Sequence, residues 1–209
     1  MRITKHGHSC LLVEDDGARL LLDPGTLSHG WTEVDGVTAV LVTHQHPDHV
    51  DVERLPQLLR RNPEAAVYAD VATAGQLRER GLDVVAVEPG DHLDLGVDVH
   101  VLGGEHAVIH PDIPVIPNNA YLVAERLLHP GDSLLVPPAP VEVLALPAAA
   151  PWLKVAEAVD YLRAVRPAVA VPIHEAVAAF PAMYYQRFLD LAPEGTEVRV
   201  LDDADPLER

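Results

Sequence analysis

The chain has 209 residues, of which 48% are hydrophobic, and this suits one domain with a sizeable core over residues 1–209. Its 15 basic residues stand against 32 acidic ones, and the net charge of −17 disfavours binding to nucleic acid or to anionic membranes. A single cysteine, Cys10, excludes an intrachain disulfide, and no stretch reaches the roughly 18 apolar residues of a membrane span. We therefore expect a cytoplasmic protein without membrane segments.

Short strands dominate the first half of the sequence. Residues 2–25 contain strands interrupted by glycines and by a turn at Asp15-Asp16-Gly17. Residues 37–44, VTAVLVTH, stay apolar until their polar end, which indicates a strand buried on both faces. After them we expect helices over 51–61 and 71–81, and strands over 65–70, 82–88, 91–95 and 97–104.

The second half repeats this order, with strands first and helices later. The expected strands cover residues 119–125, 126–132, 141–147 and 168–175. The strongest helical pattern lies over 150–167, where apolar positions recur on one face, and a last helix is expected over 181–193. Because hairpins come early in each half, we predict an α+β protein in which two sheets pack face to face between outer helices, a four-layer αββα sandwich.

The stretch THQHPDHVD, residues 43–51, places three histidines and two acids within nine positions. His44 and His46 are two residues apart and would project to the same side of an extended segment, while Asp48 and His49 follow the turn that Pro47 favours. One ion cannot easily take all four side chains, but two neighbouring ions can. A solvent-exposed polar loop is the alternative, and the density of histidines argues against it. Imidazole and carboxylate ligands suit zinc and would also accept manganese or iron.

Three further ligand-type residues follow three other predicted strands. His106 comes after the strand over 97–104, Asp132 after the hairpin, and His174 after the apolar run that begins at residue 168. Strand ends that lie side by side bring their loops together at one edge of a sheet, which is where binding sites are usually built. The sequence therefore predicts one metal site assembled from four strand ends.

These motifs resemble the metallo-β-lactamase superfamily, because THQHPDHVD matches its HxHxDH signature in full. Residues 7–25, GHSCLLVEDDGARLLLDPG, are similar to the opening of the branch that contains L-ascorbate-6-phosphate lactonase and many metal-dependent hydrolases. HPGDS and VAVPIHE resemble two later motifs of that branch. The loop that follows His106 and the segment LPAAAPW depart from the branch. Both regions would face substrate, so the lactonase substrate does not transfer.

The resemblance implies a role for each ligand-type residue. Asp23 would support the metal-binding loop from behind. His110 is the alternative to His106, and His8 and His129 would lie near the site in the core, in a supporting position or against substrate. The expected ligands are His44, His46 and His106 for a first metal, Asp48, His49 and His174 for a second, and Asp132 as the bridge.

Hydrolysis is the activity that this resemblance implies. Two divalent cations, zinc or else manganese or iron, would share a hydroxide that attacks an ester, lactone, amide or phosphoester of a small molecule, and catalytic Asp48 would orient it and take its proton. The alternatives are a nucleic-acid phosphodiesterase of the same fold, a two-iron oxidoreductase and a non-catalytic metal-binding protein. The net charge disfavours the first, His46 in place of a glutamate disfavours the second, and the full set of ligands disfavours the third.

Overall fold

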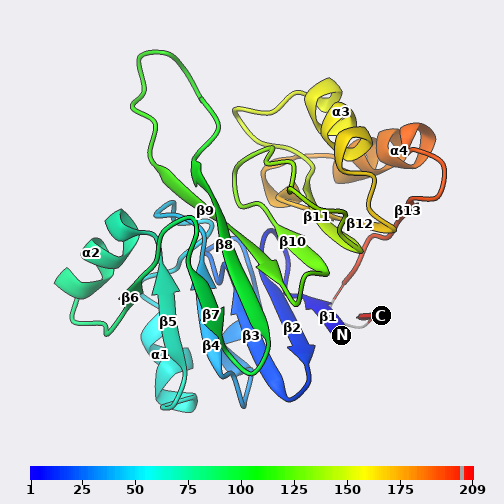
Figure 1. Ribbon diagram of the computed structural model, residues 1–209. Coiled ribbons are helices and arrows are strands. Elements are labelled where there is room, and N and C mark those ends of the chain that lie inside the picture. The colour runs from blue at the N-terminus through cyan, green and yellow to red at the C-terminus, as the bar shows by residue number, and fades with distance from the viewer. Residues whose placement is uncertain (203–204) are drawn as a thin grey trace.

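Two β-sheets packed face to face form the centre of the computed structural model, which describes residues 1–202 and 205–209 (Figure 1). The first sheet has the strand order β14-β1-β2-β3-β4-β5-β6. Its strands are β1 (Arg2–Lys5), β2 (Leu11–Asp15), β3 (Ala18–Leu22), β4 (Ala39–Val42), β5 (Ala66–Ala69), β6 (Val85–Ala86) and β14 (Leu207–Glu208).

The second sheet has the order β13-β12-β11-β10-β9-β8-β7. Its strands are β7 (His92–Asp94), β8 (Asp98–Glu105), β9 (Pro117–Val123), β10 (Leu127–His129), β11 (Val143–Pro147), β12 (Val169–Ile173) and β13 (Glu197–Val198). Hairpins open each sheet, and parallel pairs follow, β3 with β4 in the first sheet, and β10 with β11 and β11 with β12 in the second. Parallel neighbours end at the same edge, so the loops after them are brought together.

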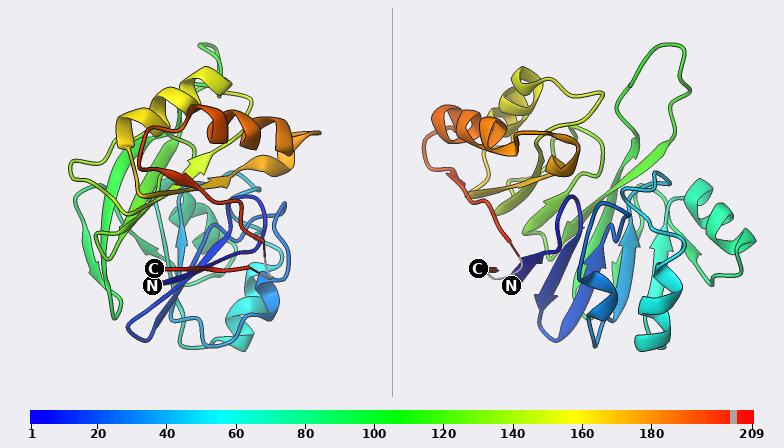
Figure 2. Two further views of the ribbon diagram at one scale, coloured as in Figure 1. Left: turned by 90° about the vertical axis from the view of Figure 1, so that its right-hand side faces the viewer. Right: turned by 180° about the vertical axis from the view of Figure 1, so that it is seen from behind.

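Four helices cover the outer faces of the sheets, as the two further views show (Figure 2). Helices α1 (Leu55–Arg61) and α2 (Val71–Glu79) lie against the first sheet, and α3 (Val155–Val165) and α4 (Pro181–Leu191) against the second. Two short 3-10 helices, η1 (Trp31–Glu33) and η2 (Glu175–Val177), lie in loops. The four-layer αββα sandwich predicted from the sequence is confirmed.

The period of two along β4 divides its side chains between two cores. Ala39 and Leu41 face the core between the sheets, where Tyr121 and Val171 meet them from the second sheet. Val40 and Val42 face the outer core beneath α1 and α2. All four side chains of β4 are buried, as expected of a strand covered on both faces. The strand therefore delivers the residues that follow it from a rigid position.

Two helices begin later than predicted, and local hydrogen bonds explain the difference. The helix expected over 51–61 begins at Leu55, because Asp51 Oδ1 accepts the backbone N–H groups of Glu53 and Arg54 at 3.0 Å in a preceding turn. The helix expected over 150–167 begins at Val155, where the Glu157 carboxylate accepts the Lys154 N–H at 2.8 Å. Residues 150–154 are consequently a loop.

The strand expected over 82–88 is reduced to the two residues of β6 at the sheet edge, and the two-residue strands β13 and β14 were not predicted. Strand β14 pairs with β1, Arg2 opposite Glu208, which brings the two ends of the chain together (Figure 2). Among the residues that the structure describes, no helix has the length and apolar character needed to cross a bilayer.

Candidate metal centre

Five strand ends converge at the edge between the two sheets. Asp23 follows β3, the segment 43–51 follows β4, His106 follows β8, Asp132 follows β10 and His174 follows β12. All seven residues predicted as ligands lie here, together with one more histidine, His8. They form two groups whose ligand atoms lie within 4.8 Å of one another: His44, His46, His106 and Asp132, and His8, Asp48, His49 and His174.

Asp132 lies between the two groups. Its Oδ2 is 3.2 Å from His106 Nε2 in the first group. Its Oδ1 is 3.1 Å from His49 Nε2 and 3.2 Å from His174 Nε2 in the second. One buried carboxylate therefore faces both groups, which is the placement expected of a residue that bridges two ions.

Several donor atoms of the centre lack hydrogen-bond partners, and this tests whether metal ions fit. Four buried atoms have none, although the histidine nitrogens among them lie close to one oxygen or the other of the Asp132 carboxylate: His49 Nε2, His106 Nε2, His174 Nε2 and Asp132 Oδ1. Buried polar atoms are rarely left in this state, because each costs about 1–3 kcal/mol. Imidazole nitrogens and carboxylate oxygens are the ligands of divalent zinc, manganese and iron. The residues present therefore fit divalent zinc, manganese or iron.

Hydrogen bonds made by the Nδ1 atoms fix the orientation of three histidines toward the centre. His106 Nδ1 donates to the carbonyl of Ala107 at 2.6 Å, and His174 Nδ1 donates to that of Ala149 at 2.7 Å. His49 Nδ1 donates to Asp23 Oδ2 at 2.7 Å. In each case the second nitrogen, Nε2, is left facing inward, and such partners are known to fix the orientation of metal-binding histidines.

Asp23 also holds the start of the metal-binding segment. Its carboxylate accepts the Thr43 backbone N–H and the Thr43 hydroxyl, each at 2.8 Å, and it is fully buried. Two glycines allow the close approach of the surrounding loops. A Cβ on Gly25 would lie 1.8 Å from the carbonyl oxygen of Asp48, and one on Gly131, where φ is +58°, would lie 2.3 Å from Asn118 Oδ1.

Burial and neighbouring charges act in opposite directions on the pKa values of the side chains in the centre. Burial disfavours ionisation of Asp132, but His49 and the other histidines outweigh it and hold the pKa of Asp132 well below its usual value. Burial likewise disfavours charge on His174, yet Asp132 and Asp48 raise the pKa of His174 to about 9. Burial lowers the pKa of His44 well below the usual value. Binding of cations would therefore displace protons from part of the centre.

His8 belongs to the second group, and the sequence motifs did not assign it a single role. It is fully buried in a left-handed conformation, with φ of +49°. Its Nε2 donates to Asp48 Oδ2 at 3.2 Å, and its ring centroid lies 4.1 Å from that of His174. The glycine before it and the end of β1 are the sequence signals that could have placed it. His8 either supplies a ligand or orients Asp48.

Trp152 was not predicted at the centre. Its indole N–H donates to Asp132 Oδ2 at 2.8 Å, and it is half-buried in the loop before α3. His129 has a structural contact instead, because its Nε2 donates to the Ser9 carbonyl at 2.9 Å. His110, the alternative third ligand, lies exposed beside Asp112 and outside both groups.

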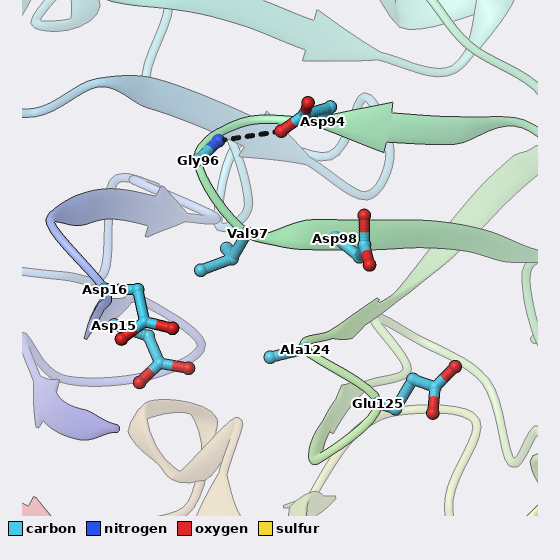
Figure 3. Close-up of a pocket in the computed structure, with 8 residues that line it drawn as sticks. All are labelled: Asp15, Asp16, Asp94, Gly96, Val97, Asp98, Ala124 and Glu125. Carbon is cyan, nitrogen blue, oxygen red and sulfur yellow. Dashed lines mark hydrogen bonds between the residues drawn. The ribbon is translucent and has the colours of Figure 1, made fainter.

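A hollow of about 530 Å³ lies at the opposite ends of the strands, away from the metal centre, and carries acidic side chains. Figure 3 shows Asp15, Asp16, Asp94, Asp98 and Glu125 spread around it, without a common point to which they turn. Within the described part of the chain they are not among the groups with metal-ligand spacing. We interpret this hollow as solvated acidic surface.

The fold and this arrangement of histidines and carboxylates define the metallo-β-lactamase superfamily. A family model described as "Beta-lactamase superfamily domain" matches residues 2–174, and the chain belongs to this family. The superfamily predicted from the sequence is thereby confirmed.

The chain is 54% identical to Protein Rv0786c of Mycobacterium tuberculosis over 211 residues, with 97% of each chain covered. It is 27% identical to a UPF0173 metal-dependent hydrolase of Aeropyrum pernix, with 99% of this chain and 97% of the relative covered. Among solved structures, Igni18, a metallo hydrolase from Ignicoccus hospitalis, is similar with a TM-score of 0.75, 21% identity, and coverage of 99% of this chain and 97% of that one. At this identity the last likeness supports the fold alone.

Proposed function

We propose that the protein is a hydrolase that holds two divalent cations and cleaves an ester, lactone, amide or phosphoester of a small molecule. One observation carries this proposal: the four buried donor atoms without hydrogen-bond partners, contributed by both groups and shared through Asp132. The similarity to the Aeropyrum relative, named a metal-dependent hydrolase, supports the same activity.

When bound, divalent cations supply Lewis acidity, which activates water for attack and polarises the bond that it attacks. His44, His46 and His106 would hold one cation, and Asp48, His49 and His174 the other, with Asp132 between them. These side chains offer nitrogen and oxygen donors, so zinc is the first choice and manganese or iron the next.

Asp48 is the carboxylate best placed to act on the reacting atoms. Its side chain is 23% exposed, whereas that of Asp132 is 4% exposed. Its Oδ2 lies 3.2 Å from His8 Nε2 and 3.4 Å from His174 Nε2, so the orientation of the carboxylate is fixed from two sides. Asp48 can therefore orient an attacking water and receive its proton.

Assays of the metal-loaded protein on p-nitrophenyl butanoate and on bis-p-nitrophenyl phosphate test this proposal. Hydrolysis of at least one of them is expected, with loss on chelation and recovery on adding zinc or manganese. Asp132→Asn should abolish it, because the shared anionic ligand is lost. Asp98→Asn, an exposed acid in the acidic hollow, is the matched control and should leave it unchanged. Hydrolysis that survives complete removal of metal would contradict the proposal.

A further inference from the structure

The loop between β8 and β9, residues 106–116, extends beyond the two sheets (Figure 1). Its base is tied to the metal centre: the His106 N–H donates to the Ile116 carbonyl at 3.0 Å, and the Ala107 N–H donates to the Asp132 carbonyl at 2.8 Å. Pro111 and Pro114 restrict its backbone. The loop is therefore positioned by the same residues that form the centre.

The base of this loop encloses a small hollow, which we call the loop pocket. It has a volume of about 80 Å³ and is lined by six aliphatic residues, Ala107, Ile109, Ile113, Pro114, Val115 and Ile116. Two candidate metal ligands, His46 and His106, complete its wall. A group in the loop pocket is thus in contact with two of the expected ligands of the first metal.

The residues that line the loop pocket determine which chemical groups can bind in it. A phosphate oxygen or another charged group would lose part of its hydration against the aliphatic side chains. An aliphatic group would gain about 0.8 kcal/mol for each methylene removed from water. Three residues of the loop, Ile109, Ile113 and Val115, are at least 36% exposed, so they have apolar surface to offer a bound molecule.

We propose that the loop pocket is a subsite for a short aliphatic group bonded directly to the carbon under attack, and that the substrates are therefore esters, lactones or amides of short aliphatic carboxylic acids. This rests on the hydrolase function proposed above and names its substrate class. A cavity of about 150 Å³ holds benzene, so the loop pocket, at about half that volume, accommodates roughly three to four carbon atoms.

Straight-chain hydroxamates, from acetohydroxamate to octanohydroxamate, are suitable probes because each binds metal through the same head group and differs only in its chain. Calorimetric titration of zinc-loaded protein should show affinity rising about fourfold per methylene up to butanohydroxamate and levelling beyond it. Among p-nitrophenyl esters, the highest rate of hydrolysis should be found at this same acyl chain length.

Variants of the loop separate the subsite from general effects. Ile109→Ala and Ile113→Ala should reduce the gain in affinity per methylene. Ala107→Leu should still bind acetohydroxamate but should weaken the binding of butanohydroxamate by about tenfold or more. Val108→Ala is the matched control: Val108 lies in the same loop, is 59% exposed and does not line the loop pocket. It should behave as the wild type.

Each outcome decides a different point. If acetohydroxamate fails to bind the zinc-loaded protein, the metal centre is wrong, and the proposed function falls together with the subsite. If it binds but the chain-length series is flat, or continues to rise to octanohydroxamate, the subsite alone is wrong. A dimer in solution that dissociates in Ile113→Ala, with a flat series, would assign the loop to an interface between two copies and also overturn the subsite.

Discussion

Trp152 holds the shared carboxylate of the centre from its loop, because its indole N–H donates to Asp132 Oδ2 and its ring centroid lies 6.1 Å from that of His106. Trp152→Phe keeps an aromatic ring and removes the donor. Loss of such a supporting hydrogen bond weakens metal affinity by about 10–100-fold, and we expect the lower end because Asp132 keeps its other contacts. Zinc titration by calorimetry measures this.

Trp31→Phe provides the control for that comparison, because it makes the same substitution in the outer core, where Arg54 covers the ring. Its zinc affinity should equal that of the wild type. Equal affinities in both variants would remove Trp152 from its supporting role.

Asp48→Asn separates chemistry from folding. The substitution preserves the shape of the side chain but removes the negative charge that would receive a proton. We expect turnover to fall by about 10²–10⁴-fold, the usual contribution of a positioned general base. The protein should still fold, with a melting temperature lowered by the loss of the contacts of this carboxylate with His8 and His174. Turnover close to that of the wild type would show that another group takes the proton.

At the scale of elements, a buried lysine links β1 of one sheet to β12 of the other. Lys5 Nζ donates to the Pro172 carbonyl at 2.8 Å and to Glu175 Oε2 at 2.6 Å, and the lysine is 2% exposed. The other carboxylate oxygen of Glu175 accepts the His8 N–H at 3.1 Å. The Lys5–Glu175 pair thus holds the backbone of His8 beside His174, whose N–H donates to the His8 carbonyl at 3.2 Å.

Lys5→Met should lower the free energy of unfolding by about 2 kcal/mol, because hydrogen bonds to charged groups contribute about 1.5–3 kcal/mol and Glu175 loses its partner. Arg61→Met is the control. Arg61 pairs with Asp35, and their side chains are 42% and 72% exposed, so solvent screens the pair and no measurable loss is expected. Urea unfolding measures both. Equal losses would mean that the buried pair does not join the sheets energetically.

The strand ends that carry ligands were predictable because β4 and β12 are short runs of buried residues followed at once by polar ones. The place of Trp152 was not predictable, because the apolar pattern of α3 extends through it. Only the contact between Glu157 and Lys154 shows where the helix begins. The contact of His8 with Asp48 joins residues 40 apart in sequence, which no local pattern encodes. Strands β13 and β14 have two residues each, too few to show a period of two.

At the scale of the whole molecule, the metal-free protein should depend on pH through its buried histidines. The carboxylates of the centre raise the pKa of His174 to about 9, against about 6.5 in an unfolded chain, and they raise the pKa of His49 as well. A raised folded pKa means that the proton stabilises the folded state. This stabilisation is complete below about pH 6.5 and is lost as pH rises through about 9.

We therefore expect the melting temperature of chelator-treated protein to fall between pH 6.5 and pH 9.5. The zinc-loaded protein should not show this fall, because cations would take the place of the protons. A metal-free protein whose melting temperature stays level or rises over this range would contradict the charge arrangement described for the centre.

The net charge of −17 includes two carboxylates buried or half-buried at one point of the molecule, Asp48 and Asp132, among five predicted histidine ligands. Cations bound there would satisfy the donor atoms that lack partners and offset part of the charge. The number of ions bound per chain therefore tests the central claim most directly. Protein purified without chelator, supplied with zinc and dialysed should contain two equivalents by elemental analysis, and Asp132→Asn should contain fewer. A reproducible value near zero for the wild type would contradict the account.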